Sequence, residues 1–383
     1  MSGGRLPPGG GSRGQVAVWL VVAAACGCPA AAAQLTVVDP GQGRVALSSG
    51  TTAAAELSGI TWTGGSNYLA VGDDGAASLW RLSVTVDASS GWITGGAVVG
   101  AVPTPGLGTD SEGIAYRAAT GSVFVSDEVA SSITQFDAAS GVTLGGIAVP
   151  AIYAPANVQS NMGLESLAFG AGGLWTANEE AVAPDGPLST TVQGTWVRIQ
   201  RFDAALAAAG QWGYRTDPIS ALTSLTTAER SGVVDVLPWT PTTLLVLERE
   251  FGGPLIPDFR SRLYGVDLAT GSDVAAVASL STGSFTPLAK TLLWEGSFGT
   301  SNFEGMTFGP TLASGFTSLL LISDNGGGIS QDLYALQVVP EPAPTAAVVA
   351  IAAVAAVMGR LRFRTCGPSR CRRAGLRGRC PPR

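Results

Sequence analysis

Short apolar runs separated by turn residues recur along the chain between residues 34 and 338. Each run begins with a polar or acidic residue and carries an aromatic or large apolar residue four positions later. Runs of this length, bounded by Gly, Asp and Ser, predict β-strands. The five copies begin at Ser58, Glu112, Glu165, Asp235 and Glu304.

A second apolar run follows each first run after a turn and ends in a polar pair. The first polar positions of the two runs lie 13 to 20 residues apart, which suits two antiparallel strands joined by a hairpin. A third run with turn signals usually follows. The pairs are Asp73-Asp74, Asp127-Glu128, Asn178-Glu179, Glu248-Arg249 and Asp324-Asn325.

A unit of three or four strands that repeats every 53 to 70 residues predicts an all-β protein of the β-propeller class. Five units are visible, but a blade of about 45 to 50 residues would divide the body into six or seven. We favour six blades, with five or seven as alternatives. The last blade would be closed by strands from residues 34–47 or from the segment after Gly271. A β-sandwich or a β-helix would also contain short strands. Neither fold explains why an acidic residue recurs at the same position of the repeat.

The composition agrees with strands and turns and excludes several kinds of catalytic site. Gly accounts for 52 of 383 residues and charged residues for only 13%, whereas 46% of residues are hydrophobic. This composition disfavours a helical bundle and a disordered chain. The chain has no His, which excludes His-ligated zinc and Ser-His-Asp catalysis.

The overall charge of −6 conceals a strongly acidic body between basic ends. Residues 34–338 contain 11 basic and 27 acidic residues, which gives this body a net charge of −16. A body of this charge repels nucleic acid and anionic lipid and attracts cations. We therefore expect no nucleic-acid partner.

Residues 1–33 are predicted to be a secretory signal peptide. Arg5 and Arg13 precede an apolar run over 16–25, and three alanines over 31–33 form a small-residue cleavage site. Lipid attachment at Cys26 is the weaker alternative. The signal implies a secreted or cell-surface protein that is exported through the inner membrane.

Residues 339–364 join Val339-Pro340-Glu341-Pro342, an apolar stretch over 346–358 and an Arg cluster that begins at Arg360. This segment resembles the PEP-CTERM sorting signal of exported bacterial proteins. The resemblance implies processing by an exosortase-type membrane protease and contact with the membrane through this segment only. An ordinary C-terminal membrane anchor is the alternative. A basic tail with three Cys follows over 365–383, and all five Cys lie outside 34–338.

Four short segments of the body at 34–338 are distinctive. They are Asp110-Ser111-Glu112-Gly113, Val125-Ser126-Asp127-Glu128, Asn161-Met162-Gly163-Leu164-Glu165 and Asn302-Phe303-Glu304-Gly305. With these segments the chain from about residue 56 to residue 337 resembles the family called esterase-like activity of phytase. The resemblance implies a phytase-like propeller and the hydrolysis of phosphoric or other esters.

The acidic residues that recur at the start of the first strand predict a ring of carboxylates. The first strand of each propeller blade lines the central axis, so corresponding residues should meet at one mouth of the channel. Oxygen ligands without His or Cys favour Ca²⁺, with Mg²⁺ second. The predicted metal ligands are Asp127, Glu128, Glu179, Asp235, Glu248 and Asp324.

A calcium ion at this mouth could assist hydrolysis of a small anionic ester. One of Glu112, Glu165 and Glu304 would then act as the general base. Arg249, Arg198 and Lys290 are the predicted groups that bind the anionic substrate.

Three alternatives remain open at this point. Single carboxylates could serve only to accept hydrogen bonds from turn N–H groups. A bound calcium ion could be structural. The rival function is a non-catalytic cell-surface propeller that binds polysaccharide, protein or matrix components.

Overall fold

The computed structural model describes residues 35–48, 54–73, 75–220, 230–252, 258–324 and 330–340. The predicted signal peptide, most of the predicted sorting segment (341–364), the basic tail and all five Cys lie outside these residues. Within them the chain forms β-strands and three short 3₁₀ helices, η1 (Ala151–Tyr153), η2 (Ala183–Asp185) and η3 (Leu268–Thr270). No helix in the described ranges is long and apolar enough to cross a membrane.

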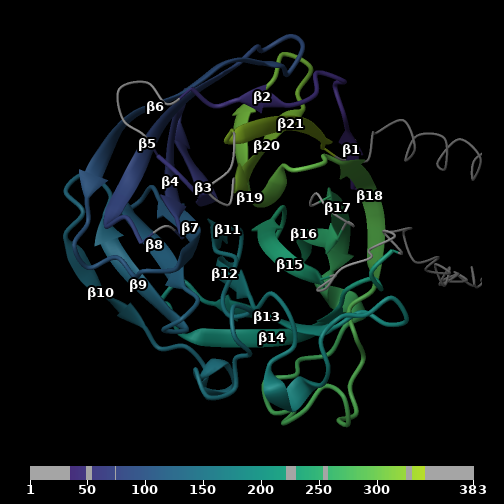
Figure 1. Ribbon diagram of the computed structural model, residues 1–383. Helices are drawn as coiled ribbons and strands as arrows, with labels where there is room; N and C mark the ends of the chain where they lie inside the picture. Colours follow the sequence, from purple (N-terminus) through teal and green to yellow (C-terminus); the bar gives the residue numbers. More distant parts are fainter. Residues whose placement is uncertain are drawn as a thin grey trace, which may run out of the picture. The chain divides into compact units, whose positions relative to one another are not determined.

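The strands form five antiparallel sheets, which are the blades of a β-propeller (Figure 1). Blade 1 contains β3 (Leu57–Gly64), β4 (Asn67–Gly72), β5 (Ser78–Val86) and β6 (Ile93–Pro103). Blade 2 contains β7 (Ser111–Arg117), β8 (Ser122–Asp127), β9 (Ser132–Asp137) and β10 (Thr143–Ile147). Blade 3 contains β11 (Ala168–Gly170), β12 (Gly173–Ala177), β13 (Trp196–Phe202) and β14 (Ala208–Arg215).

The last two blades contain the remaining strands. Blade 4 contains β15 (Arg230–Pro238), β16 (Thr243–Gly252), β17 (Asp258–Asp267) and β18 (Lys290–Ser297). Blade 5 contains β19 (Asn302–Thr311), β20 (Thr317–Asp324), β21 (Asp332–Val339), β1 (Thr36–Val38) and β2 (Val45–Ala46). Both N-terminal strands pair with β21, so the two ends of the propeller close one blade together.

The first strand of every blade lies nearest the centre of the ring (Figure 1). Strand β3 contacts β7, β7 contacts β11, β11 contacts β15, β15 contacts β19, and β19 returns to β3. The ring is therefore complete with five blades among the described residues. Strands β6, β10, β14 and β18 lie at the outer edge.

The blade number corrects our prediction of six. The segment 34–47 closes the last blade, as one of our two alternatives predicted, but that blade is the fifth, because β1 and β2 pair with β21. The segment after Gly271 supplies β18, which is the outer strand of blade 4. Dividing the length by an average blade gave too many blades because long connections, such as 178–195, lie between the strands.

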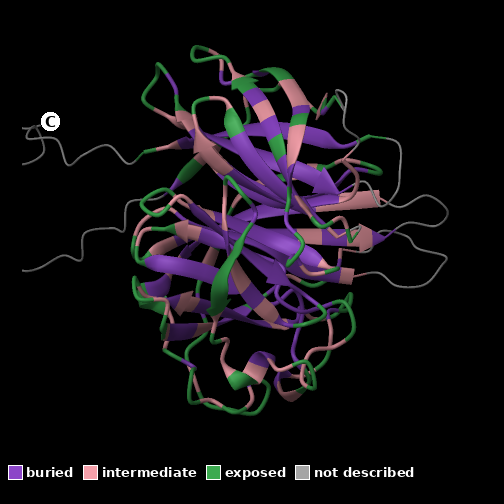
Figure 2. Cartoon of the chain, turned by 90° about the vertical axis from the view of Figure 1, so that its left-hand side faces the viewer, coloured by how far each residue is buried: buried purple, intermediate pink, exposed green. Residues whose placement is uncertain are grey.

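The hydrophobic core is divided among the interfaces between neighbouring blades. Apolar side chains on alternating strand positions pack against the facing sheet, as Val71 and Leu79 of blade 1 do against Ile114 and Val125 of blade 2. Buried residues lie along the strands, and exposed residues lie mainly in the loops (Figure 2). Burial of these faces is the main term that holds the ring together.

At one position of the repeat, in blades 1, 2 and 5, the inner strand lies so close to the neighbouring blade that only glycine fits. A Cβ atom added at Gly113 would lie 2.4 Å from the backbone nitrogen of Leu167 in blade 3. A Cβ atom at Gly59 would lie 2.2 Å from the backbone oxygen of Glu112 in blade 2. Backbone atoms cannot move aside as a flexible side chain can.

Replacing Gly113 by Ala should therefore destabilise the protein. Overpacking of this kind costs about 1–3 kcal/mol, which urea denaturation would measure. The matched control is Gly95→Ala on β6, where an added Cβ atom meets no atom within 4 Å. That substitution should change the free energy of unfolding by less than about 1 kcal/mol. Equal effects of the two substitutions would contradict the close approach of blades 2 and 3.

Candidate functional site

Each inner strand, or the segment that leads into it, contains a bulge at the same place. In blade 1 the pairing shifts between Leu57 and Gly59, which leaves Ser58 as the extra residue. In blade 5 the shift leaves Glu304 as the extra residue in the same way. A β-bulge re-aims a side chain away from the regular alternation of the strand. The residues at the five bulges are Ser58, Glu112, Glu165, Val234 and Glu304.

The second strand of each blade places another side chain beside its bulge. Leu57 pairs with Gly72, Ser111 with Asp127 and Val233 with Glu248. The next residue along the second strand pairs with the residue two positions before the bulge, as Arg249 does with Gly232 and Asp324 does with Asn302. These five residues are Asp73, Glu128, Glu179, Arg249 and Asp324.

The two sets meet at the centre of the ring. Blades 2 and 5 are separated by blade 1, yet the charge of Glu304 acts on Glu112. Arg249 of blade 4 contacts Glu179 of blade 3 and Glu304 of blade 5, with its Nη2 atom 2.9 Å from one Oε1 atom and 3.0 Å from the other. We call this group the axial cluster. It consists of Asp73, Asp110, Glu112, Glu128, Glu165, Glu179, Arg249, Glu304 and Asp324.

The axial cluster contains all three predicted catalytic carboxylates and three of the six predicted metal ligands. Glu112, Glu165 and Glu304 come from bulges, and Glu128, Glu179 and Asp324 come from second strands. Arg249, a predicted substrate-binding residue, is the arginine at its centre. Asp110 was missed as a site residue, although it stands two positions before Glu112 in a segment of the sequence that we had singled out.

Asp235 lies outside the axial cluster, because the bulge in blade 4 falls on Val234. Asp235 therefore takes the place that glycine holds in blades 1, 2 and 5, where the neighbouring blade is closest. Its two carboxylate oxygens accept hydrogen bonds from the backbone nitrogens of Val236 at 2.8 Å and Met306 at 2.6 Å. The structure thus gives Asp235 a role between blades 4 and 5.

Asp127 and Glu248 each stand one residue before the axial position and point into the space between blades. One oxygen of Asp127 accepts a hydrogen bond from the Ala130 nitrogen at 2.5 Å. Glu248 accepts hydrogen bonds from Tyr214 at 2.5 Å and from Lys290 at 2.6 Å. The sequence pattern predicted both residues at the axial position, which in the structure belongs to the residue that follows each of them.

Two of the predicted substrate-binding residues are also occupied elsewhere. Arg198 is 1% exposed and forms an ion pair with Asp185, with 2.5 Å between Nε and Oδ2. Lys290 on the outer strand β18 contacts Glu248 and also Asp217, at 2.8 Å. Neither residue reaches the axial cluster, and we leave both out of the proposed site.

The carboxyl groups of the axial cluster hold protons more tightly than usual. Burial, with Glu179 as the next cause, raises the pKa of Glu128 to about 8. Burial raises the pKa of Glu304 to about 8, although Arg249 acts in the opposite direction. Burial and the charge of Asp324 raise the pKa of Asp73 to about 7. Carboxylates this close together cannot all ionise without a compensating cation.

Glu112 and Glu165 are affected most strongly. Burial raises the pKa of Glu112 well above its usual value, and the charge of Glu304 adds to this effect. Ser58 donates a hydrogen bond to Glu112 and opposes the shift. Burial also raises the pKa of Glu165 well above its usual value, with Glu112 and Glu128 as the next causes. These groups would release protons if a cation bound among them.

The oxygen atoms of the axial cluster could hold a metal ion. Oxygens of Asp73, Asp110 and Glu112 lie within 4.8 Å of one another, and so do oxygens of Glu128, Glu165 and Glu179. Glu165 is 5% exposed, and no described residue donates a hydrogen bond to its carboxylate. The Oδ1 atom of Asn302 is also buried without a hydrogen-bond partner among the described residues. These unpaired oxygens suit a hard cation.

Comparison with solved structures returns chains of low sequence identity. The PQQ-bound form of an aldose sugar dehydrogenase from Streptomyces coelicolor is 15% identical, with 80% of this chain and 99% of that chain covered and a TM-score of 0.35. A calcium structure of a Trichoderma reesei carbohydrate-active enzyme of family AA12 is 12% identical, with 77% and 95% covered and a TM-score of 0.35.

Comparison with curated proteins finds no match. Residues 52–327 match the phytase-like family described as esterase-like activity of phytase. The matched range includes blades 1 to 4, strands β19 and β20 of blade 5, and every residue of the axial cluster. This chain is a member of the phytase-like family described as esterase-like activity of phytase.

Proposed function

We propose that the protein is an exported, calcium-assisted hydrolase of phosphoric esters whose active site is the axial cluster. The observation that carries the proposal is the set of bulges at Glu112, Glu165 and Glu304, because they turn carboxylates from three separate blades toward one point. Membership of the phytase-like family favours ester hydrolysis as the reaction class.

The proposed calcium ligands are the oxygens of the two close carboxylate groups. Glu128, Glu165 and Glu179 form one group, and Asp73, Asp110 and Glu112 form the other. When bound, the ion would supply a positive charge that polarises a phosphoryl oxygen. The absence of His and of Cys within 34–338 favours calcium over softer metals.

Glu304 is the proposed general base. Its pKa of about 8 lies near neutral pH, where a base that accepts a proton from water is most effective. Arg249 and Asn302 hold its Oε1 atom in place, at 3.0 Å and 2.7 Å. Arg249 also keeps a buried Nε donor without a partner among the described residues, which suits an anionic substrate.

The proposed place of work is the cell surface or the medium. The features that support it are the secretory signal pattern of residues 1–33 and the sorting-signal pattern of residues 339–364. An exosortase-type protease would be the processing partner. The acidic body agrees with this proposal because it does not favour nucleic acid or anionic lipid.

The test is hydrolysis of p-nitrophenyl phosphate and phytate by the purified protein, with calcium and with EDTA. We expect turnover only with calcium. Glu304→Gln should lower kcat by about 10²–10⁴-fold while calcium still raises the melting temperature. Glu165→Gln should abolish both the turnover and the calcium-induced rise in melting temperature.

Glu295→Gln is the matched control, because this side chain is 56% exposed on the outer strand of blade 4. It should leave kcat unchanged. Absence of turnover in both conditions would refute the hydrolase. If calcium still raised the melting temperature in that case, the ion would be structural and the non-catalytic surface propeller would be favoured.

A further inference from the structure

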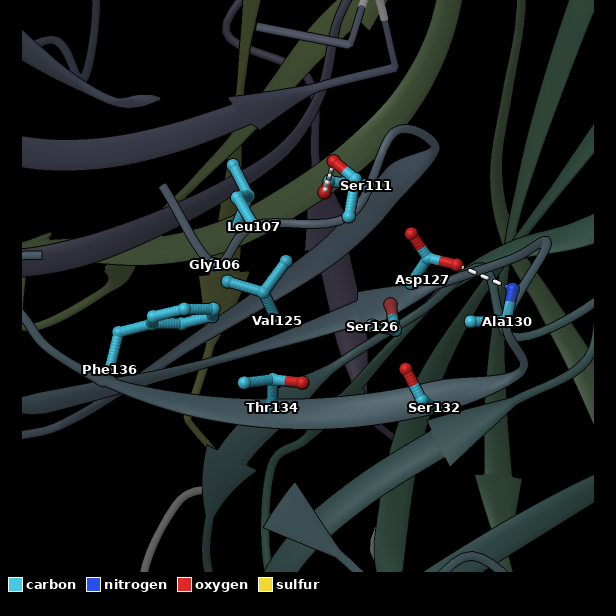
Figure 3. Close-up of a pocket in the computed structure, with 11 residues that line it drawn as sticks. Gly106, Leu107, Ser111, Val125, Ser126, Asp127, Ala130, Ser132, Thr134 and Phe136 are labelled. Atoms are coloured by element: carbon cyan, nitrogen blue, oxygen red, sulfur yellow. Dashed lines mark hydrogen bonds between the residues drawn. The ribbon is translucent and has the colours of Figure 1, made fainter. Parts of the chain in front are cut away.

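A pocket of about 230 Å³ lies beside the axial cluster, on the side of blade 2 that faces blade 1. Figure 3 shows that its walls come from the second and third strands of blade 2 and from the connection between β6 and β7. Asp127 lies at one end, and the next residue, Glu128, belongs to the axial cluster. A molecule in this pocket would therefore sit next to the proposed calcium ligands.

The polar groups in the pocket are mostly uncharged hydroxyls. Ser132 and Thr134 point their hydroxyl groups into it (Figure 3), and no described residue forms a hydrogen bond with either hydroxyl. The Ser111 hydroxyl donates to the Gly108 oxygen at 3.2 Å. These hydroxyls can both donate and accept hydrogen bonds.

Asp127 is the one charged side chain among the residues that line the pocket. It is 7% exposed, and only its Oδ1 atom has a hydrogen-bond donor, the nitrogen of Ala130. The Oδ2 atom remains as an acceptor for a ligand. A Cβ atom at Gly108 would lie 1.6 Å from this oxygen, so glycine at that position permits the observed orientation of Asp127.

The other wall of the pocket is apolar. Leu107, Val125 and Phe136 line it and belong to the core between blades 1 and 2. An apolar wall opposite hydroxyl and carboxylate groups suits a ligand with a C–H face and several hydroxyl groups. The volume is below the usual range for drug-sized ligands, which favours a single small ring.

The charge of the pocket excludes an anionic group. Its lining contains no Arg or Lys, and Asp110 lies close enough to Asp127 for the two charges to act on each other. A phosphate group would be repelled here. A calcium ion would find only one carboxylate, whereas this ion takes six to eight oxygen ligands.

We infer that this pocket binds a neutral polyhydroxyl ring, such as a sugar or a cyclic polyol. The inference extends the proposed function, because the ring would be the alcohol part of the ester whose phosphoryl group reaches the axial cluster. Asp127 and Thr134 would accept and donate hydrogen bonds to ring hydroxyls, and the apolar wall would contact the C–H face.

The experiment is saturation-transfer NMR with D-glucose and myo-inositol as probes, in EDTA, so that neither calcium nor hydrolysis is needed. We expect saturation transfer to at least one probe. Thr134→Val and Asp127→Asn should each weaken this binding about tenfold, as the loss of one hydrogen bond predicts. Thr85→Val, the same substitution at an exposed position of β5, should leave it unchanged.

Three outcomes would overturn the inference. They are no transfer to either probe with folded protein, equal transfer in all variants, and displacement of glucose by inorganic phosphate. A further measurement uses glucose 6-phosphate in the presence of calcium. This ester should bind more tightly than glucose. If glucose binds and its phosphate ester gains nothing from calcium, the pocket stands as a site for a sugar of a polysaccharide and the proposed hydrolase fails.

Discussion

Without calcium, the free energy of unfolding should fall as the pH rises from about 5 to about 8. In the folded protein, Glu128 and Glu304 keep their protons until about pH 8. In the unfolded chain the same groups ionise near their ordinary value of 4.5. Between these values the folded state binds more protons than the unfolded state, so that raising the pH favours unfolding.

The expected loss is large, because both groups are buried. One pKa unit corresponds to about 1.4 kcal/mol, so a shift from 4.5 to about 8 implies a change of several kcal/mol. The chain has no His, and no other side-chain type with an ordinary pKa titrates between pH 5 and 8. The pH profile should therefore report on buried carboxyl groups. Most of them belong to the axial cluster, and Asp235, Glu180 and Glu248 outside it also contribute because burial raises their pKa values.

Calcium should reverse this trend, because it binds the ionised carboxylates. The difference in unfolding free energy between calcium and EDTA should be small at pH 5 and largest at pH 8. Urea denaturation at four pH values in each condition measures it. Glu304→Gln should reduce the slope in EDTA. A free energy that rises with pH in EDTA would show that the folded protein already holds these carboxylates in their ionised form.

The repeat made the fold class predictable, whereas blade number depended on features that the pattern does not contain. A run of apolar residues that starts at Glu112 or Glu304 predicts an inner strand, and five such runs predict a propeller. The closure of blade 5 by Thr36–Val38 is a long-range pairing. No local pattern states which β-sheet a terminal strand will join.

The axial cluster was predictable to within one residue. A bulge adds a residue to one strand without changing the apolar alternation that a reader of the sequence can see. In blade 4 the acidic residue comes one position after the bulge. The pattern therefore predicted Asp235 at the bulge position, which in the structure is occupied by Val234. In blade 2 both Asp127 and Glu128 were predicted as ligands, and only Glu128 lies in the axial cluster. In blades 2 and 5 the acidic residue stands directly before a glycine, as in Glu112-Gly113 and Glu304-Gly305, and there the predicted residues are the ones at the bulge.

Replacing Arg249 by Met should cost about 3–5 kcal/mol of unfolding free energy in EDTA. Arg249 is the arginine at the centre of the axial cluster, and its Nη2 atom contacts Glu179 and Glu304. Burial alone would lower its pKa, but these carboxylates together raise it. Removal of one partner from a buried ion pair leaves an uncompensated charge, which costs this amount. The Met side chain resembles the apolar part of the Arg side chain, so the substitution removes only the positive charge and the N–H donors of the guanidinium group.

Calcium should restore much of the stability that Arg249→Met loses, because a cation in the axial cluster supplies positive charge to the same carboxylates. The matched control is Arg262→Met, since Arg262 is 7% exposed and pairs with Glu250 at 2.7 Å outside the axial cluster. That variant should lose similar stability in EDTA and regain none of it with calcium. Equal losses for Arg249→Met in calcium and in EDTA would mean that the ion binds beyond the reach of Glu179 and Glu304, and the site would then have to be sought elsewhere on the protein.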